Sequence, residues 1–261
     1  MIPEIFIESW RETAKWQTLA MVEQDLIISR ALIELYNNPN ISNSLVFRGG
    51  TALNKLFLNP PARYSEDIDF VQIKPEPIGA TIDTIRELFS SWLGEPKRKI
   101  TERSAKLLYQ YQAINGLPSK LKIEINTTEH FQVMPLKKMP FDVNSEWFNG
   151  KAEIITYELE ELIATKLRAL YQRRKGRDLF DLWYVLKDHN LDIDNIIETF
   201  KKYCANDDIT ISKDVFLENL EQKKLNIDFQ TDMNVLLPNH INWDFEKAFD
   251  FVKTKIIEKL N

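Results

Sequence analysis

The stretch FRGGTALNKLF, residues 47–57, lies where two sequence patterns meet. The apolar run at residues 45–47 predicts a short buried strand, and residues 51–58 have the apolar spacing of a helix with Thr51 as a candidate N-cap. Gly49 and Gly50 form the corner between them. Such a corner is either only a tight turn or a place where backbone N–H groups approach a phosphate, because glycine allows close approach and a helix N-terminus favours an anion.

The composition describes a chain long enough to bury a substantial core. It has 261 residues, 44% of them hydrophobic, and a net charge of -5, which argues against a protein that coats nucleic acid through its overall field. One cysteine and three scattered histidines predict neither an internal disulfide nor a Cys/His metal cage. No apolar run predicts a membrane span and no signal segment is recognisable. We therefore expect a cytoplasmic protein in which carboxylates would hold any metal.

The periodicity predicts an α+β fold. Residues 1–150 form a core with N-terminal helices and a small mixed sheet, and residues 151–261 form a helical C-terminal domain that carries a motif from Lys166 to Asp181. The predicted helices span residues 7–36 (one or two helices), 51–58, 78–93, 158–173 and 178–186, and the predicted strands span 45–47, 67–73, 105–113 and 121–126. Residues 130–155 are expected to be a polar connector.

Two aspartates, Asp67 and Asp69, begin the strand predicted at residues 67–73. Residues i and i+2 of a strand project to the same side, so the two carboxylates converge, and they repel unless a divalent cation or a shared proton lies between them. With oxygen ligands alone, Mg²⁺ is the natural ion. Glu124, on the polar face of residues 121–126, is a candidate third carboxylate. The alternatives are a solvated strand face for the aspartates and pairing with Lys122 or another base for Glu124.

The densest basic patch, KLRALYQRRKGR at residues 166–177, contains no acidic side chain. On one continuous helix, Lys166, Arg173 and Arg177 would share a side, and Lys166 and Arg173 would face phosphates of the nucleotide or the acceptor RNA. Such a run is as often a solvated surface. Gly176 is expected to end that helix. Asp178 is then either a functional carboxylate or the cap of the next helix, with Asp181 supporting the cap or pairing with Arg177. Arg48 and Arg63 either flank the cleft or are ordinary surface arginines.

Taken in order, FRGGTALNKLF, RYSEDIDF and ELIATKLRALYQRRKGRDLFDL resemble the AbiEii/AbiGii toxin family of MenT-like nucleotidyltransferases. That family is part of the DNA polymerase beta-like nucleotidyltransferase superfamily, whose signature is a Gly-Gly or Gly-Ser corner, a short helix and then D-x-D. The resemblance covers most of residues 15–190. It does not extend to the last seventy or so residues.

The resemblance implies a polymerase beta-like core and the toxin of a toxin–antitoxin or abortive-infection phage-defence pair. Such an enzyme would use Mg²⁺, with two ions conceivable, to transfer NMP from an NTP to an acceptor hydroxyl, in characterised members on tRNA. The implied partner is a cognate antitoxin, a winged-helix protein encoded alongside, and the implied state is a monomer. Two alternatives are a nucleotidyltransferase acting on a small molecule or a protein, and a non-catalytic RNA- or protein-binding module on the same scaffold.

The resemblance also implies a role for each matched position. Asp67 and Asp69 would hold the metal, with Glu124 added by the strand argument above, and Asp178 would be a further essential acid. Ser65 lies where such toxins can be silenced by phosphorylation. The residues expected to contact the nucleotide are Gly49, Gly50, Thr51, Ser65, Lys166 and Arg173.

Overall fold

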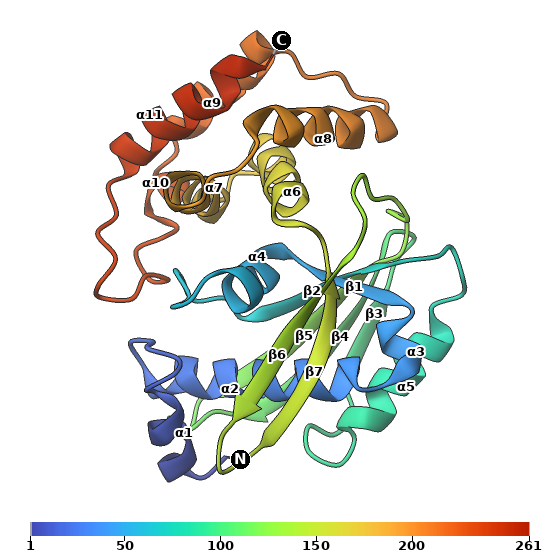
Figure 1. Cartoon of the computed structure of the whole chain (residues 1–261). Helices are drawn as coiled ribbons and strands as arrows, with labels where there is room; N and C mark the ends of the chain where they lie inside the picture. Colours follow the sequence, from blue (N-terminus) through green and yellow to red (C-terminus); the bar gives the residue numbers. More distant parts are fainter. Residues whose placement is uncertain (1, 261) are drawn as a thin grey trace. The chain divides into compact units, whose positions relative to one another are not determined.

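The computed structural model describes residues 2–260 and divides the chain into two compact units, Met1–Tyr157 and Glu158–Asn261. Figure 1 shows the strands in the first unit and only helices in the second. The expected boundary at residue 150 falls inside the last strand of the sheet, β7 (Asn149–Thr156), which remains with the first unit.

The first unit is built on a mixed sheet, which the described residues form from seven strands in the order β3-β4-β5-β2-β1-β7-β6. β1 pairs parallel with β7 and β2 parallel with β5, and the other neighbours are antiparallel. This confirms the α+β prediction. The other strands are β1 (Leu45–Arg48), β2 (Asp67–Gln72), β3 (Lys97–Ile100), β4 (Ser104–Gln112), β5 (Pro118–Asn126) and β6 (Lys137–Asn144).

Three of these strands contradict the sequence prediction. It placed a polar connector over β6 and β7, and it predicted no strand at the position of β3. β3 and β6 are the two edges of the sheet, and every residue of β3 is exposed. Edge strands tolerate charged residues and proline, here Pro140, so they lack the apolar alternation that indicates a strand. β7 does alternate, because Ala152, Ile154 and Thr156 are buried. That alternation could have identified β7 from the sequence.

Helices flank the sheet. α2 crosses the strands in Figure 1 and packs against β7 and β6. Its side chains Leu26 and Leu32 are fully buried. Burying each such side chain contributes ~1.5–3 kcal/mol to folding. The helix expected over residues 7–36 is two helices, because Thr18 caps α2 by accepting the Met21 N–H. The helices of this unit are α1 (Glu4–Trp10), α2 (Leu19–Tyr36), α3 (Pro39–Ser42), α4 (Gly49–Ala52), the π-helical turn η1 (Leu53–Phe57) and α5 (Gly79–Phe89).

The second unit is helical, as predicted. Large aromatic side chains such as Phe200, Phe216 and Phe249 fill its core. Its elements are α6 (Leu159–Gln172), α7 (Gly176–Asp188), α8 (Ile193–Asn206), α9 (Lys213–Lys224), α10 (Ile227–Thr231), α11 (Phe245–Lys255) and η2 (Ile257–Lys259). None of the helices described in residues 2–260 is long and apolar enough to cross a membrane.

Candidate functional site

Asp67 and Asp69 lie on one face of β2. The residues between and after them, Ile68 and Phe70, are buried on the opposite face, which fixes the direction of both carboxylates. Asp69 is half-buried and pairs in register with Arg48 on β1 and Glu124 on β5. The sequence prediction that two carboxylates share one side of this strand is therefore realised in the backbone register.

The environment of Asp69 disfavours the ionised form of its carboxyl group. Burial raises the pKa of its carboxyl, the charge of Asp67 raises it further, and Lys122 and Arg48 offset only part of that effect. A cation placed against the two carboxylates would relieve both penalties. Two carboxylates supplemented by substrate phosphates are a donor set that suits Mg²⁺. Within residues 2–260, no group of three or more acidic, histidine or cysteine side chains is arranged as a metal cage.

Glu124 lies beside Asp69, on the neighbouring parallel strand, but its carboxylate is engaged by lysines. Lys106 Nζ lies 2.8 Å from Oε1, and Lys122 Nζ lies 3.4 Å from Oε2 and 2.7 Å from Asp67 Oδ2. Burial alone would raise the pKa of Glu124, but the hydrogen bonds and charges of the two lysines outweigh it and lower that pKa. The lysine pairing weighed from the sequence is thus present.

Gly49 lies directly against Asp69. Its φ of 81° belongs to the left-handed region, and a β-carbon there would lie 2.7 Å from Asp69 Oδ2. Both observations require glycine at this position. The glycine corner is therefore shaped around the acidic pair, a contact between segments twenty residues apart that sequence reasoning did not identify.

Glycine is required at position 50 for a different reason. The space where its side chain would project is occupied by the guanidinium of Arg63, which is only 2% exposed. Asn54 fastens this arrangement, because its Oδ1 accepts the Ala62 and Arg63 N–H groups and its Nδ2 donates to Gly50 O. The surface alternative for Arg63 is wrong. Arg48 forms an ion pair with Glu129 at 2.9 Å.

Thr51 does not cap the helix, because α4 begins at Gly49 and Arg48 is its N-cap residue. The buried Thr51 hydroxyl donates to Asp67 O at 2.5 Å and lies 2.7 Å from Ser65 Oγ. Since the single hydroxyl proton of Thr51 goes to Asp67, Ser65 is the donor in the second bond. Thr51 and Ser65 therefore fix the backbone at the start of β2, immediately before the acidic pair.

In the second unit, the basic motif folds into a buried charge cluster. Lys166 Nζ lies 3.3 Å from Asp178 Oδ1 and 2.9 Å from Asp181 Oδ2, and Arg173 binds Asp178 with two hydrogen bonds of 2.6 and 2.8 Å. Burial of Asp178 opposes its ionisation, but Lys166 and Arg173 outweigh this and lower its pKa. The Arg173 side chain is 54% exposed, so it remains accessible beside the buried acid.

Four expectations for this motif are wrong. α6 ends at Gln172, so Lys166, Arg173 and Arg177 do not share one continuous helix. Gly176 begins α7 rather than breaking a helix, and Asp178 lies inside its first turn without capping it. Asp181 pairs with Lys166, while Arg177 pairs with Asp232 at 3.1 Å. Asp232 also accepts the Arg177 N–H, so a residue far along the chain holds the start of α7.

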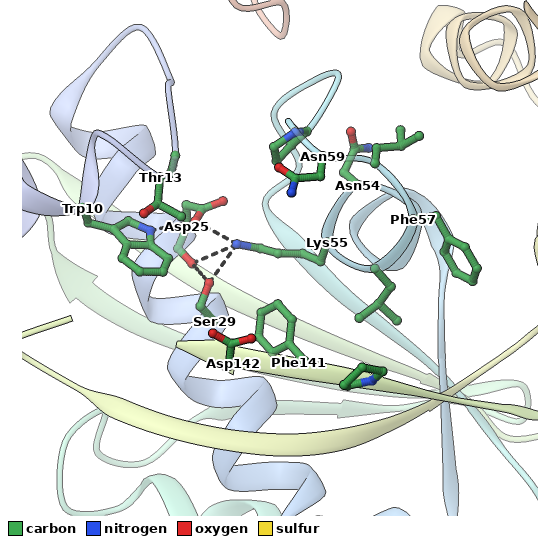
Figure 2. A pocket seen from close by; sticks show the side chains of 15 residues that line it. Trp10, Thr13, Asp25, Ser29, Asn54, Lys55, Phe57, Asn59, Phe141 and Asp142 are labelled. Atoms are coloured by element: carbon green, nitrogen blue, oxygen red, sulfur yellow. Dashed lines mark hydrogen bonds and ion pairs between the residues drawn. The ribbon is translucent and has the colours of Figure 1, made fainter. Parts of the chain in front are cut away.

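A separate cavity of about 350 Å³ lies in the first unit, where α1, α2, η1 and β6 meet (Figure 2). In it, Lys55 Nζ lies 2.7 Å from Asp25 Oδ1 and donates to Ser29 Oγ at 2.8 Å. The indole N–H groups of Trp10 and Trp16 donate to the two oxygens of Asp25. The polar groups at the base are thus satisfied by one another, and they tie η1, the continuation of the glycine-corner helix, to α2.

A Gly-Gly corner whose first glycine packs against Asp69, with Asp67 on the same face of the neighbouring strand, defines the class of a nucleotidyltransferase. The family model described as "Nucleotidyl transferase AbiEii toxin, Type IV TA system" matches residues 30–251, and the chain belongs to this family. The match extends well beyond residue 190, where the resemblance by motif ended.

Solved structures share the fold. MenT4, a nucleotidyltransferase toxin from Mycobacterium tuberculosis H37Rv, aligns with a TM-score of 0.67 and 15% identity over 100% of this chain and 91% of its own. JHP933 from Helicobacter pylori aligns with a TM-score of 0.54 and 20% identity over 94% of each chain. A putative nucleotidyltransferase from H. pylori aligns with a TM-score of 0.55 and 20% identity over 92% of this chain and 95% of its own. A search of curated proteins returned no significant match.

Proposed function

We propose that this AbiEii-family enzyme is a Mg²⁺-dependent toxin that transfers NMP from an NTP to a hydroxyl group of tRNA and releases pyrophosphate. The observation that carries the proposal is the acidic pair, Asp67 and Asp69, projecting to one side of β2 with Gly49 packed against Asp69. In the reaction the acceptor oxygen bonds to the α-phosphorus, the bond from the α-phosphorus to pyrophosphate breaks, and the hydroxyl proton passes to solvent water. Mg²⁺, when bound, supplies charge neutralisation on the phosphates and a lower pKa for the acceptor hydroxyl.

The residues of the first unit are proposed to have three roles: binding the metal, binding the phosphates and supporting the start of β2. Asp67 and Asp69 would hold the ion, and the corner at Gly49, Gly50 and Thr51 would bring backbone N–H groups to the phosphates. Thr51 and Ser65 support this by fixing the start of β2 through Asp67 O. A phosphate on Ser65 would break that contact, which is a physical route for silencing the enzyme by phosphorylation.

Glu124 is assigned an electrostatic role rather than that of a base. Its lowered pKa and its two lysine partners make it a poor proton acceptor near neutral pH. We place it beside Asp69, where Lys106 and Lys122 balance its charge.

In the second unit, Arg173 is proposed to contact phosphate, with Asp178 orienting its guanidinium. The two hydrogen bonds from Arg173 to Asp178 support this, because they hold an exposed guanidinium in one direction. Lys166, expected from the sequence to bind the nucleotide, is buried between Asp178 and Asp181, so we assign it the role of holding these acids. We further propose that the enzyme works as a cytoplasmic monomer and is controlled by a winged-helix antitoxin.

The direct test incubates the protein with each labelled NTP, Mg²⁺ and total tRNA, with and without EDTA. Wild type should label tRNA only in the presence of the metal, and Asp67→Ala should label nothing. Asp83→Ala is the matched control, because Asp83 is an exposed aspartate on α5. The proposal fails if Asp67→Ala labels as much as wild type. Label on a protein or a small molecule would keep the reaction and refute the acceptor.

A further inference from the structure

The face of the sheet that carries the acidic pair continues outward across three more strands. In register, Asp69 lies beside Glu124 on β5, Glu124 beside Lys106 on β4, and Lys106 beside Lys99 on β3. Directly paired residues on neighbouring strands project to the same side. This row therefore runs from the acidic pair to the β3 edge of the sheet, about 14 Å away at roughly 4.8 Å per strand.

A second row runs parallel to the first. Asp67 pairs in register with Lys122, Lys122 with Leu108, and Leu108 with Lys97. Lys120 lies two residues before Lys122 on β5 and therefore on the same face. Residues of the opposite face on β4 and β5, such as Leu107 and Ile123, are fully buried. The lysines thus belong to the solvent side of the sheet.

The charges on this face change sign with distance from the acidic pair. Near the pair, Lys106 and Lys122 are bound by carboxylates. Farther out, Lys97, Lys99 and Lys120 are exposed, and no ion pair or hydrogen bond of their ammonium groups is found within residues 2–260. Their positive charges are therefore available to an anionic partner, in a chain whose total charge is -5.

From this arrangement we infer that the lysine face, defined as Lys97, Lys99, Lys106, Lys120 and Lys122, binds the phosphate backbone of the RNA acceptor. The inference rests on the proposed function and deepens it by assigning a path for that substrate. Two features favour a polyanion over a small acceptor. The face is elongated, and the free charges of Lys97 and Lys99 lie on β3, three strands away from the acidic pair.

Charge repulsion near the acidic pair fits the same assignment. An RNA strand that approached the carboxylates directly would be repelled, and Lys106 and Lys122 screen Glu124 and Asp67 along its path. The outer lysines would then supply affinity, because each phosphate contact releases close to one counterion. The binding should consequently weaken steeply with salt.

Binding of labelled tRNA, measured by fluorescence anisotropy over 50–300 mM salt without NTP, tests the inference separately from catalysis. The double variant Lys97→Gln/Lys99→Gln should lose roughly 5-fold in affinity per lysine near 0.1 M salt, and the slope of log K against log salt should fall by about 1.4–1.8. Arg98→Gln is the matched control. Arg98 is an exposed cation on the same strand, but it pairs in register with Leu107 and so projects to the opposite face.

Four outcomes decide the matter. Selective loss in the lysine variant, with recovery in Lys97→Arg/Lys99→Arg, supports the lysine face. Equal binding by the lysine variant and Arg98→Gln overturns it. Unchanged tRNA binding with new self-association on size-exclusion chromatography also overturns it, because the lysines then only protect a sheet edge. If the wild-type protein transfers nucleotide but binds no tRNA, the assignment of the lysine face to RNA is overturned. The proposed nucleotidyltransferase activity is then unaffected.

Discussion

Replacing Gly49 with alanine changes both the backbone energy and the position of Asp69. At a φ of 81°, an alanine side chain costs ~1–2 kcal/mol relative to glycine. The added β-carbon would also lie 2.7 Å from Asp69 Oδ2, so the carboxylate must move by about 0.7 Å to reach ordinary van der Waals contact. We expect Gly49→Ala to unfold with ~1–3 kcal/mol less stability.

Gly49→Ala should also slow catalysis in the molecules that remain folded. Displacement of a catalytic group by about 1 Å can cost 10²-fold, so the rate of nucleotide transfer by folded Gly49→Ala should fall about 10- to 100-fold. Transfer measured at 15 °C, where the variant remains folded by circular dichroism, separates the two effects. Growth inhibition on expression provides a second measurement.

Gly94→Ala provides the control for the backbone term. Gly94 has a similar φ of 72°, but nothing lies within 4 Å of the place of its β-carbon. It should lose comparable stability and keep wild-type activity. If Gly49→Ala, compared at equal folded fraction, transfers nucleotide as fast as Gly94→Ala, the contact with Asp69 has no catalytic importance and the reasoning is refuted.

Three further predictions concern the buried charges. Lys166→Met leaves Asp178 and Asp181 without their shared cation, and we expect a loss of ~3–5 kcal/mol in urea unfolding; a loss below 1 kcal/mol would contradict it. A double-mutant cycle with Asp25→Asn and Lys55→Met should give a coupling of ~1–3 kcal/mol, and additive losses would show that the ion pair between α2 and η1 is weak. Burial lowers the pKa of Lys223 to about 8, so between pH 8 and 10.5 the unfolded chain binds more protons at this position. The difference in unfolding free energy between wild type and Lys223→Met should therefore shift in favour of wild type as the pH rises through that window, and a constant difference would refute the assignment.

Lys223 also shows what the last third of the chain contributes. Its ammonium donates to the carbonyls of Leu170 and Tyr171 at the end of α6, while Asp232 holds the first turn of α7. The turn that carries Arg173 is thus held from both sides by residues beyond 220. Sequence reasoning assigned these residues no role, because nothing local in α9 or α10 indicates which helix ends they contact.

The sequence by itself determined the features that depend on local periodicity. Alternation along residues 67–72 places Asp67 and Asp69 on one side of a strand, and helical spacing identifies the motif around Lys166, because both periods follow from backbone geometry. Only the tertiary structure decided that Gly49 packs against Asp69, that Arg63 fills the space beside Gly50, and that Lys106 and Lys122 bind Glu124. Those contacts join segments distant in the chain, so they exist only once the strand order and register of the sheet are set.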